Sequence, residues 1–510
     1  MRGARPLLLM LLALSFVCFG NAVFASDIEE KEQALKEKFF AAEMAQPQIL
    51  KIALVDCIAY ALKNNSEIKV EKIEPLVSEQ DVKIAESAFE PTFSAQASLS
   101  DNKEETPSIL MGSHSRTGQL STGVSGKLIT GTQYSLDFLN TNYKDNSAIL
   151  SVNPYYQMTS ALTITQPIFK DFGISVNRAK ITIANNNLDK SDQNLKKELI
   201  DTIGSVEEAY YLYVLYLEKY KTAEISLQRA KDLLAIVEKR YAKGMASSID
   251  LLEAKTGVAE REDALLNMQQ AAQNAADNLK YITGLIDDPQ LWQAQIEPLD
   301  RPEPEKEEID LVENLKQAFD YRPDYIAYKI DLKNQDIQIL LKKNSLLPSI
   351  DLVGSLGING LDEDYDQSLK ADYKQWSAGV QVSVPWGMKE EKADYEKANL
   401  TKQQLLLGFE RLQQAIILQV REAVRAVNIS GEKIDTAKNR LDTQDARYKA
   451  IEKRFQQGLV STHDMLEYQE DLSSAETNYI QSLIDYANSL VGLKQATGTT
   501  LVKNDITLEE

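Results

Sequence analysis

The stretch RYAKGMASSIDLLEAK (residues 240–255) returns as RFQQGLVSTHDMLEYQ (residues 454–469), and the two align without a gap. At a constant offset the copies share an arginine, a glycine, a serine, an aspartate and a glutamate: Arg240 and Arg454, Gly244 and Gly458, Ser247 and Ser461, Asp250 and Asp464, Glu253 and Glu467. A chain that contains one turn twice is predicted to consist of two structural repeats.

Each copy of this turn lies between two long helical patterns. Residues 175–243 and 390–457 contain no proline, so each run predicts a helix on the order of 100 Å long. The apolar positions follow the 3, 4 spacing of a coiled-coil seam, as in Leu227, Ala230, Leu234, Val237 and Tyr241. A glycine just past a helix tolerates the left-handed conformation, and a serine with an aspartate three residues later resembles a capping box. The repeated turn is therefore predicted to be the tip of two helical hairpins.

The two repeats divide the chain. We place them at residues 50–284 and 308–498, joined by a linker at 285–307 that is rich in proline and acidic residues. A segment at 26–49 precedes them, and a tail at 499–510 follows them. Within the repeats we expect strands in 91–168 and 348–385, and long helices in 175–283 and 389–497.

The strand regions alternate strictly between apolar and polar residues. Phe93, Ala95, Ala97 and Leu99 alternate with serine, threonine and glutamine, and residues 376–384 repeat the pattern. Period two predicts strands with two different faces. Long polar loops at one end suit an outer-membrane barrel, although a soluble β-sandwich alternates in the same way.

The N-terminus has the pattern of a secretory signal peptide over residues 1–25. Arg2 and Arg5 precede an apolar run at 7–19, and Ala25 ends a small-residue cleavage site. The mature chain then keeps only Cys57, so it has no internal disulfide. A formal net charge of −20 argues against nucleic acid as a partner. No long apolar segment follows residue 26, so membrane insertion would require a barrel.

The order of these parts, present twice, resembles the TolC family of outer-membrane efflux and secretion channels. The resemblance covers nearly all of the mature chain and includes residues 322–324 (RPD), 347–349 (LPS), 165–169 (TQPIF) and both arginine–aromatic–x–x–glycine turns. It implies a mixed α+β membrane protein that forms a homotrimer, with a shared β-barrel in the outer membrane and a coiled-coil tunnel of long helices in the periplasm. It also implies docking of a periplasmic adaptor and an inner-membrane pump, of the resistance-nodulation-division or ATP-binding cassette type.

The first repeat departs from this family pattern. It holds two extra alternating segments, 118–128 and 132–140, joined at Thr130 and Gly131. They would either lengthen strands and loops outside the membrane or add a hairpin to the sheet. We expect about four barrel strands per chain.

The sequence contains no arrangement typical of an enzyme. It has two histidines, no metal-spaced His/Cys cluster and no phosphate-binding glycine loop, so we expect no catalytic, metal or cofactor site. The candidate site is instead a ring of carboxylates at the tips, Asp464, Glu467, Asp250 and Glu253, which would favour cations at a narrow mouth. The alternative for the two aspartates is helix capping alone.

The resemblance implies that a tyrosine and an arginine hold the tips closed, but the matching positions here are Phe455 and Val460. Arg240, Arg454, Tyr241 and His463 are candidate substitutes. We expect closure to depend on packing of Phe455, Leu459 and Val460. The positions expected to serve closure or adaptor docking are Arg240, Tyr241, Gly244, Arg454, Phe455, Gly458, Leu459 and Val460.

These expectations together describe a passive exit duct of an efflux pump or a type I secretion system. It would lie in the outer membrane, extend into the periplasm, and pass small molecules or secreted protein. The alternative is a soluble periplasmic coiled-coil scaffold with a β-domain and no pore.

Overall fold

A computed structural model describes residues 32–34, 36–37, 40, 49–106, 112–147, 149–302 and 306–506 of the chain. The predicted signal peptide at residues 1–25 lies outside these residues. The chain divides into two compact units. A helical unit comprises the described residues up to Lys72, those within Leu195–Pro323 and those from Ala415 onward, and a sheet unit comprises those within Ile73–Asn194 and Asp324–Gln414.

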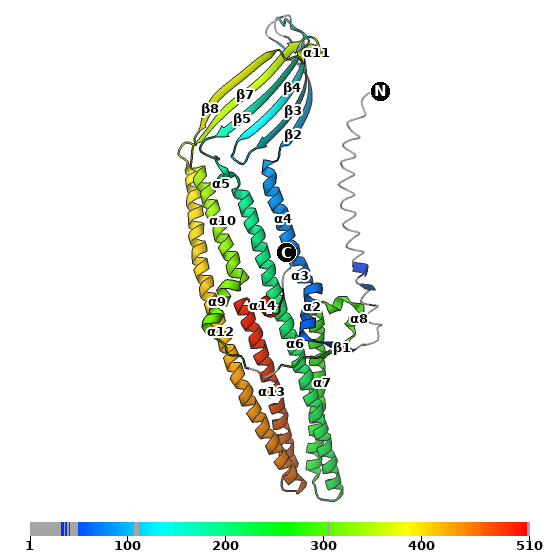
Figure 1. The fold of residues 1–510 in the computed structure, drawn as a ribbon. Coiled ribbons are helices and arrows are strands. Elements are labelled where there is room, and N and C mark those ends of the chain that lie inside the picture. The colour runs from blue at the N-terminus through cyan, green and yellow to red at the C-terminus, as the bar shows by residue number, and fades with distance from the viewer. Residues whose placement is uncertain are drawn as a thin grey trace. The chain divides into compact units, whose positions relative to one another are not determined.

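The helical unit is built around two helical hairpins (Figure 1). The first joins α6 (Ala179–Ala242) to α7 (Ser248–Thr283), and the second joins α12 (Lys389–Gln456) to α13 (Thr462–Thr497). α6 and α12 begin in the sheet unit. Within the described residues, no helix is long and apolar enough to cross a membrane.

Shorter elements of the helical unit pack on the hairpins. They are β1 (Ile49–Ile52), α2 (Leu54–Asn64), α3 (Ser66–Glu71), η2 (Leu285–Asp287), α8 (Pro289–Trp292), β6 (Gln295–Pro298), α9 (Leu311–Tyr321) and α14 (Thr500–Lys503). Apolar side chains of β1, α2, η2, α8, β6 and α14 join Ile203, Tyr210 and Leu279 of the hairpins in one cluster. This cluster also buries Cys57. The helical unit therefore has a packed hydrophobic core in addition to its coiled-coil hairpins.

The stretch predicted as a linker contains ordered elements in its first part. β6 pairs in parallel with β1, and Leu285 and Ile296 are buried. These apolar side chains stand among acidic and proline residues, so the composition of the stretch hides its contribution to the core.

The sheet unit holds one antiparallel sheet of six strands. Its spatial order is β2 (Thr92–Lys103), β3 (His114–Lys127), β4 (Gln133–Asp145), β5 (Tyr155–Pro167), β7 (Ser349–Asp362) and β8 (Tyr373–Ser383). The other elements that lie wholly or almost wholly in this unit are α4 (Ile73–Glu86), η1 (Ser87–Phe89), α5 (Ile174–Asn177), α10 (Pro323–Ser345) and α11 (Tyr365–Ser368).

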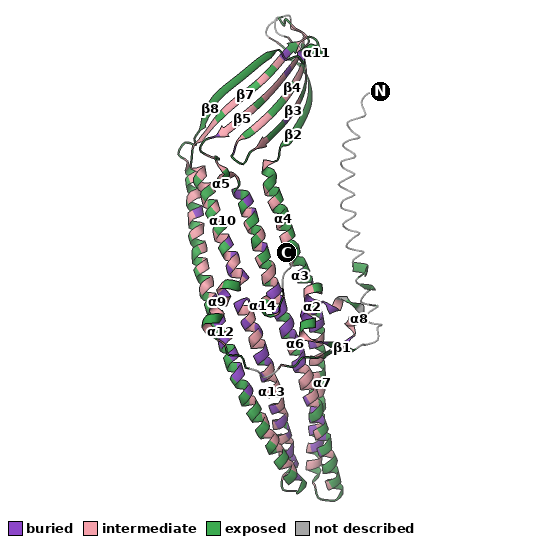
Figure 2. Cartoon of the chain, viewed as in Figure 1, coloured by how far each residue is buried: buried purple, intermediate pink, exposed green. Residues whose placement is uncertain are grey.

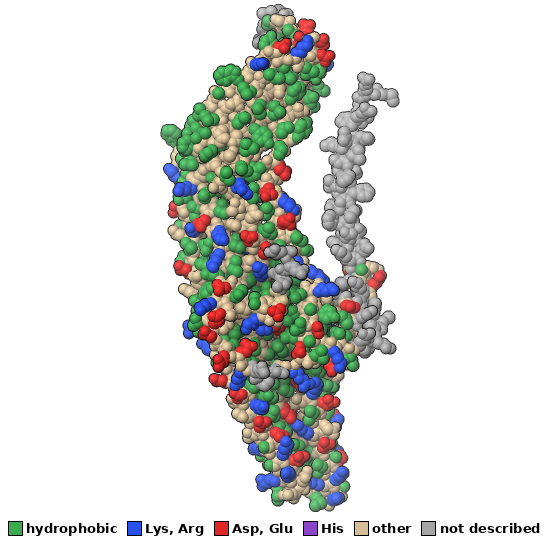
Figure 3. Space-filling view, viewed as in Figure 1, with side chains coloured by type: hydrophobic (Ala, Val, Ile, Leu, Met, Phe, Trp, Pro, Cys, Tyr) green, Lys and Arg blue, Asp and Glu red, His purple; other side chains and the backbone are tan. Residues whose placement is uncertain are grey.

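The register gives the sheet one apolar face and one polar face. Phe93 lies opposite Val124, which lies opposite Leu136, and Leu162 lies opposite Leu356. The alternate positions are mainly serine, threonine and glutamine. Figure 3 shows hydrophobic side chains spread over the sheet, with charged ones gathered at the end near α11. The predicted two-faced strands are therefore present.

The prediction of about four strands per chain is wrong, because the extra segments of the first repeat form β3 and β4 inside the sheet. Their alternation is in phase with that of β2 and β5, so pairing continues both faces without a break. Both edge strands, β2 and β8, are exposed along their whole length (Figure 2).

Candidate functional site at the hairpin tips

The two repeated turns have the same backbone geometry. In the first, the amide of Met245 donates to the carbonyl of Arg240 (2.8 Å) and that of Gly244 donates to Tyr241 (2.9 Å). In the second, Leu459 donates to Arg454 (3.0 Å) and Gly458 donates to Phe455 (2.9 Å). Each glycine is left-handed, with φ of 72° and 76°. Both helices thus end in a Schellman motif, which explains the glycine at this place in each copy.

Each turn is followed by a complete capping box. The hydroxyl of Ser247 accepts from the amide of Asp250 (3.1 Å), and the Asp250 carboxylate accepts from the Ser247 amide (2.8 Å). Ser461 and Asp464 repeat the arrangement. Hydrogen bonds from the serine, first from its hydroxyl and then from its amide, lower the pKa of both aspartates. Both aspartates are therefore occupied as helix caps.

The two glutamates of the predicted carboxylate ring differ from the aspartates. Within the described residues, neither Glu253 nor Glu467 takes part in a hydrogen bond or ion pair, and Glu467 is exposed. Each follows its aspartate by three residues, so it shares that face of its helix. Helix capping does not account for the glutamates.

Arg240 joins the two hairpins. Its Nη2 donates to the carbonyls of Phe455 (2.5 Å) and Gln456 (3.2 Å), at the C-terminus of α12. The guanidinium also lies 4.5 Å from the centre of the Phe455 ring. A cation at a helix C-terminus satisfies free carbonyls and complements the helix dipole. Of the four residues proposed as substitutes for the family's closing contacts, Arg240 is the one that bonds the other hairpin.

Packing also joins the tips within one chain. Phe455 is buried in a cluster with Leu233, Val237 and Met465, and the partly buried Val460 packs against this cluster. Leu459, in contrast, is 64% exposed at the turn. Phe455 and Val460 therefore contribute to contacts between the hairpins, whereas Leu459 does not belong to this cluster.

Arg261 is a tip residue that the sequence did not single out. It is 7% exposed, and its guanidinium on α7 donates to the carbonyls of Gly257 (3.2 Å) and Leu466 (3.3 Å). Its Nη2 also lies 3.6 Å from the Glu470 carboxylate on α13. An arginine beside a glycine one helical turn away is the only local signal, and it does not indicate which helix lies opposite.

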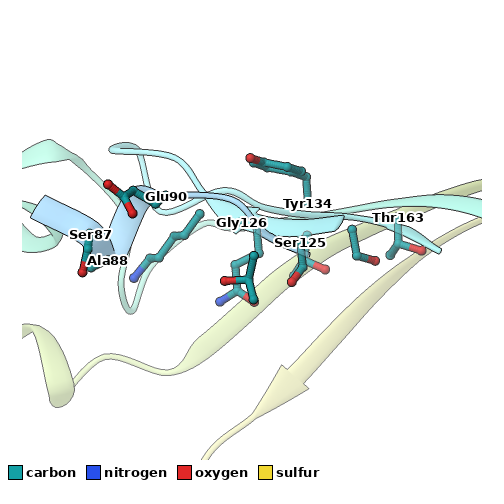
Figure 4. Close-up of a pocket in the computed structure, with 12 residues that line it drawn as sticks. Ser87, Ala88, Glu90, Ser125, Gly126, Tyr134 and Thr163 are labelled. Atoms are coloured by element: carbon teal, nitrogen blue, oxygen red, sulfur yellow. The ribbon is translucent and has the colours of Figure 1, made fainter. Parts of the chain in front are cut away.

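A second candidate is a hollow of about 480 Å³ on the polar face of the sheet, near η1. Figure 4 shows the hydroxyl side chains of Ser125 and Thr163 on one side of the strands and the ring of Tyr134 on the other. The lining also includes the charged side chains of Glu90 and Lys127, and its other polar groups are mainly hydroxyls and glutamine. The part of the chain that the structure describes also contains no group of three or more His, Cys, Asp or Glu placed to hold a metal.

The fold and the tips define a class of protein: a sheet with one apolar and one polar face, joined in one chain to paired helical hairpins with closely packed tips. The family model for outer membrane efflux proteins matches residues 57–285 and 314–499. The chain belongs to this family.

Individual relatives agree with the family. The chain is 25% identical over 306 residues to the solvent efflux pump outer membrane protein SrpC of Pseudomonas putida, covering 59% of this chain and 62% of that protein. It is 24% identical over 300 residues to the pyoverdine export outer membrane protein OpmQ of Pseudomonas aeruginosa, covering 56% and 59%. The alignments thus span less than two thirds of these relatives.

The fold matches solved channels over more of its length. The CmeC outer membrane channel of Campylobacter jejuni superposes with a TM-score of 0.66 at 19% identity, covering 88% of this chain and 85% of that one. These comparisons confirm the predicted family, the fold of a sheet with long helices, and the outer-membrane location.

Proposed function

We propose that three copies of this chain form a passive exit duct in the outer membrane. The observation that supports the duct most directly is a sheet that has one apolar face and two edge strands without a neighbouring strand on their outer side. β2 and β8 are exposed over 12 and 11 residues, so each leaves a row of amide and carbonyl groups without partners. In a bilayer such groups must be paired, and β8 of one copy can pair with β2 of the next.

Three six-stranded sheets closed in this way give a barrel of eighteen strands. Barrel diameter grows roughly linearly with strand number, so at equal tilt the barrel is about 1.5 times as wide as one with four strands per chain. The apolar face then meets lipid, and the serine, threonine and glutamine face lines a wet lumen. The hairpin β3–β4 accounts for the extra width.

The hairpin tips would form the periplasmic mouth of this duct. Three chains bring six tips together, each with one unpartnered glutamate, Glu253 or Glu467. A ring of carboxylates favours cations and repels anions. The capping aspartates, Asp250 and Asp464, add negative charge to the ring while their hydrogen bonds hold the turns.

The duct supplies no energy, so it requires partners. A periplasmic adaptor would dock on the exposed turn residues, among them Gly244, Gly458 and Leu459, and an inner-membrane pump would drive the cargo. The names of the relatives include solvent efflux and pyoverdine export. We therefore propose small organic molecules as the first cargo class, with secreted protein as the alternative.

The test is single-channel conductance of the purified protein in a planar bilayer. We would compare the parent with the Glu253→Gln/Glu467→Gln variant, which keeps both capping boxes. Glu432→Gln, an exposed acid far from the tip on α12, is the matched control.

A cation-preferring pore whose preference falls in the double variant and not in the control supports both the duct and the acidic mouth. A pore whose cation preference is unchanged would still support the duct and would rule out the ring of glutamates. A folded trimer that conducts nothing, even after the tip contacts are broken, would support the periplasmic scaffold instead. The exposed apolar face of the sheet already argues against that scaffold, because water would cover it.

A further inference from the structure

The two repeated turns have equal backbones but unequal surroundings. Arg240 bonds the end of α12, whereas its equivalent Arg454 is exposed and has no partner in the described chain. The aromatic residue after each arginine shows the same inequality. Phe455 is 2% exposed, because Arg240 and the other hairpin cover it, while its equivalent Tyr241 is 46% exposed.

A second pair of equivalent residues, one on α7 and one on α13, shows the same inequality in burial. Leu466 packs against Gly257 so closely that a Cβ on this glycine would lie 2.7 Å from the leucine Cδ2. The matching residue of the first hairpin, Leu252, is 66% exposed. The second hairpin thus presents Phe455 and Leu466 to the first, whereas Tyr241 and Leu252 of the first hairpin are exposed in the part of the chain that the structure describes.

The hydrogen-bonding groups at the end of α6 also match those at the end of α12. The carbonyl of Phe455 accepts from Gly458 and from Arg240, and that of Gln456 accepts from Arg240 alone. The Tyr241 carbonyl accepts from Gly244 only, and no described residue donates to Ala242. The end of α6 therefore has the same two vacancies that Arg240 fills on α12, at the negative end of a helix.

We propose that in the assembled protein Arg454 of one copy donates to the Tyr241 and Ala242 carbonyls of the next copy and lies over its Tyr241 ring. This inference rests on the homotrimer of the proposed function and names its contact at the tip. The interface inside one chain is repeated between chains, so hairpins alternate around the mouth. A head-to-tail contact of this kind closes into a ring when the rotation allows it.

The inference is tested by cross-linking the purified trimer with a short bismaleimide. The variant Ala242→Cys/Arg454→Cys places one thiol on each side of the proposed contact, on different copies. The matched control Arg240→Cys/Gln456→Cys places them across the contact that lies within one chain. The parent has only Cys57 after removal of residues 1–25, and burial of this thiol keeps the background low.

We expect covalent dimers and trimers from 242/454, and monomers with an internal cross-link from 240/456, identified by mass. Internal cross-links in the control with only monomers in 242/454 would overturn the proposed contact. Arg454→Gln should also raise the frequency of channel opening by about the same factor as Arg240→Gln, and a silent Arg454→Gln would contradict it.

The failure of this inference is distinct from failure of the duct. A trimer that conducts but gives no cross-link between copies overturns the Arg454 contact alone. A chain that is monomeric in several detergents and forms no pore overturns both the contact and the proposed function.

Discussion

The Arg240 contact predicts how strongly one side chain holds the two tips together. Replacing Arg240 with Gln removes the two hydrogen bonds to Phe455 and Gln456, the ring contact at 4.5 Å, and a cation at the end of α12. At this half-exposed place the hydrogen bonds contribute about 1 kcal/mol, the value of an ordinary intramolecular hydrogen bond. The ring contact adds about 0.5 kcal/mol, and the helix dipole adds roughly 0.5 kcal/mol.

The sum is about 2 kcal/mol per chain, which corresponds to about a 30-fold change in the local opening equilibrium. Amide hydrogen exchange measures such openings directly. We expect amides in the turn that follows α12, including that of Gly458, to exchange about 30 times faster in Arg240→Gln. Amides in the core around Tyr210 should not change.

The matched control is Lys239→Gln, which removes an exposed neighbouring cation that makes no bond within the described chain. It should leave exchange at the tip within a factor of two or so, as for an ordinary surface change. Equal exchange in Arg240→Gln and Lys239→Gln would show that packing of Phe455 alone holds the tips, and the reasoning from the guanidinium would be refuted.

Three further predictions follow from the described contacts. Because hydrogen bonds lower the pKa of Asp250 and Asp464, these carboxylates stabilise the fold above about pH 4, and this stabilisation is lost as the pH falls through the lowered pKa values. The melting temperature should therefore decrease as the pH is lowered through this range, and it should decrease less in the Asp250→Asn/Asp464→Asn variant. Burial raises the pKa of Cys57 to about 12, so the folded protein should not react with maleimide at pH 8, while the unfolded protein should. Deleting residues 114–145 removes β3 and β4 and should leave a trimer with a narrower lumen, because β2 runs in the same direction as β4 and can pair with β5 in its place. Polymers added from outside should then be excluded from the pore at a smaller molecular size, and an unchanged size cut-off would contradict the eighteen-strand barrel.

The features that the sequence predicted correctly depend on neighbouring residues. A glycine after a helix and a serine three residues before an aspartate determine the turn by local hydrogen bonds, so Gly458, Ser461 and Asp464 were sufficient. The two faces of the sheet likewise follow from strict alternation along each strand.

The features that the sequence did not predict depend on distant residues. Whether β3 and β4 join the sheet depends on pairing with β2 and β5, and alternation is the same in a loop extension and in a strand of the sheet. Arg240 and Arg454 occupy equal places in the repeat, so no local pattern indicates that one of them is bonded and the other exposed. Arg261 acts through the backbone of another hairpin, which has no local sequence signal.

The inequality of the two turns follows from counting contacts in an open series. Two hairpins placed side by side make one contact between them and leave one complementary surface at each end, here Arg454 on one and Tyr241 on the other. The same holds for the sheet, since its six strands form five pairings and leave the outer edges of β2 and β8 unpaired. Adding copies in a line moves these open surfaces but never removes them. Closure of the series into a ring, as we propose, would satisfy every arginine and every strand edge, and it would account for a chain with two equivalent turns that fills the contact of only one.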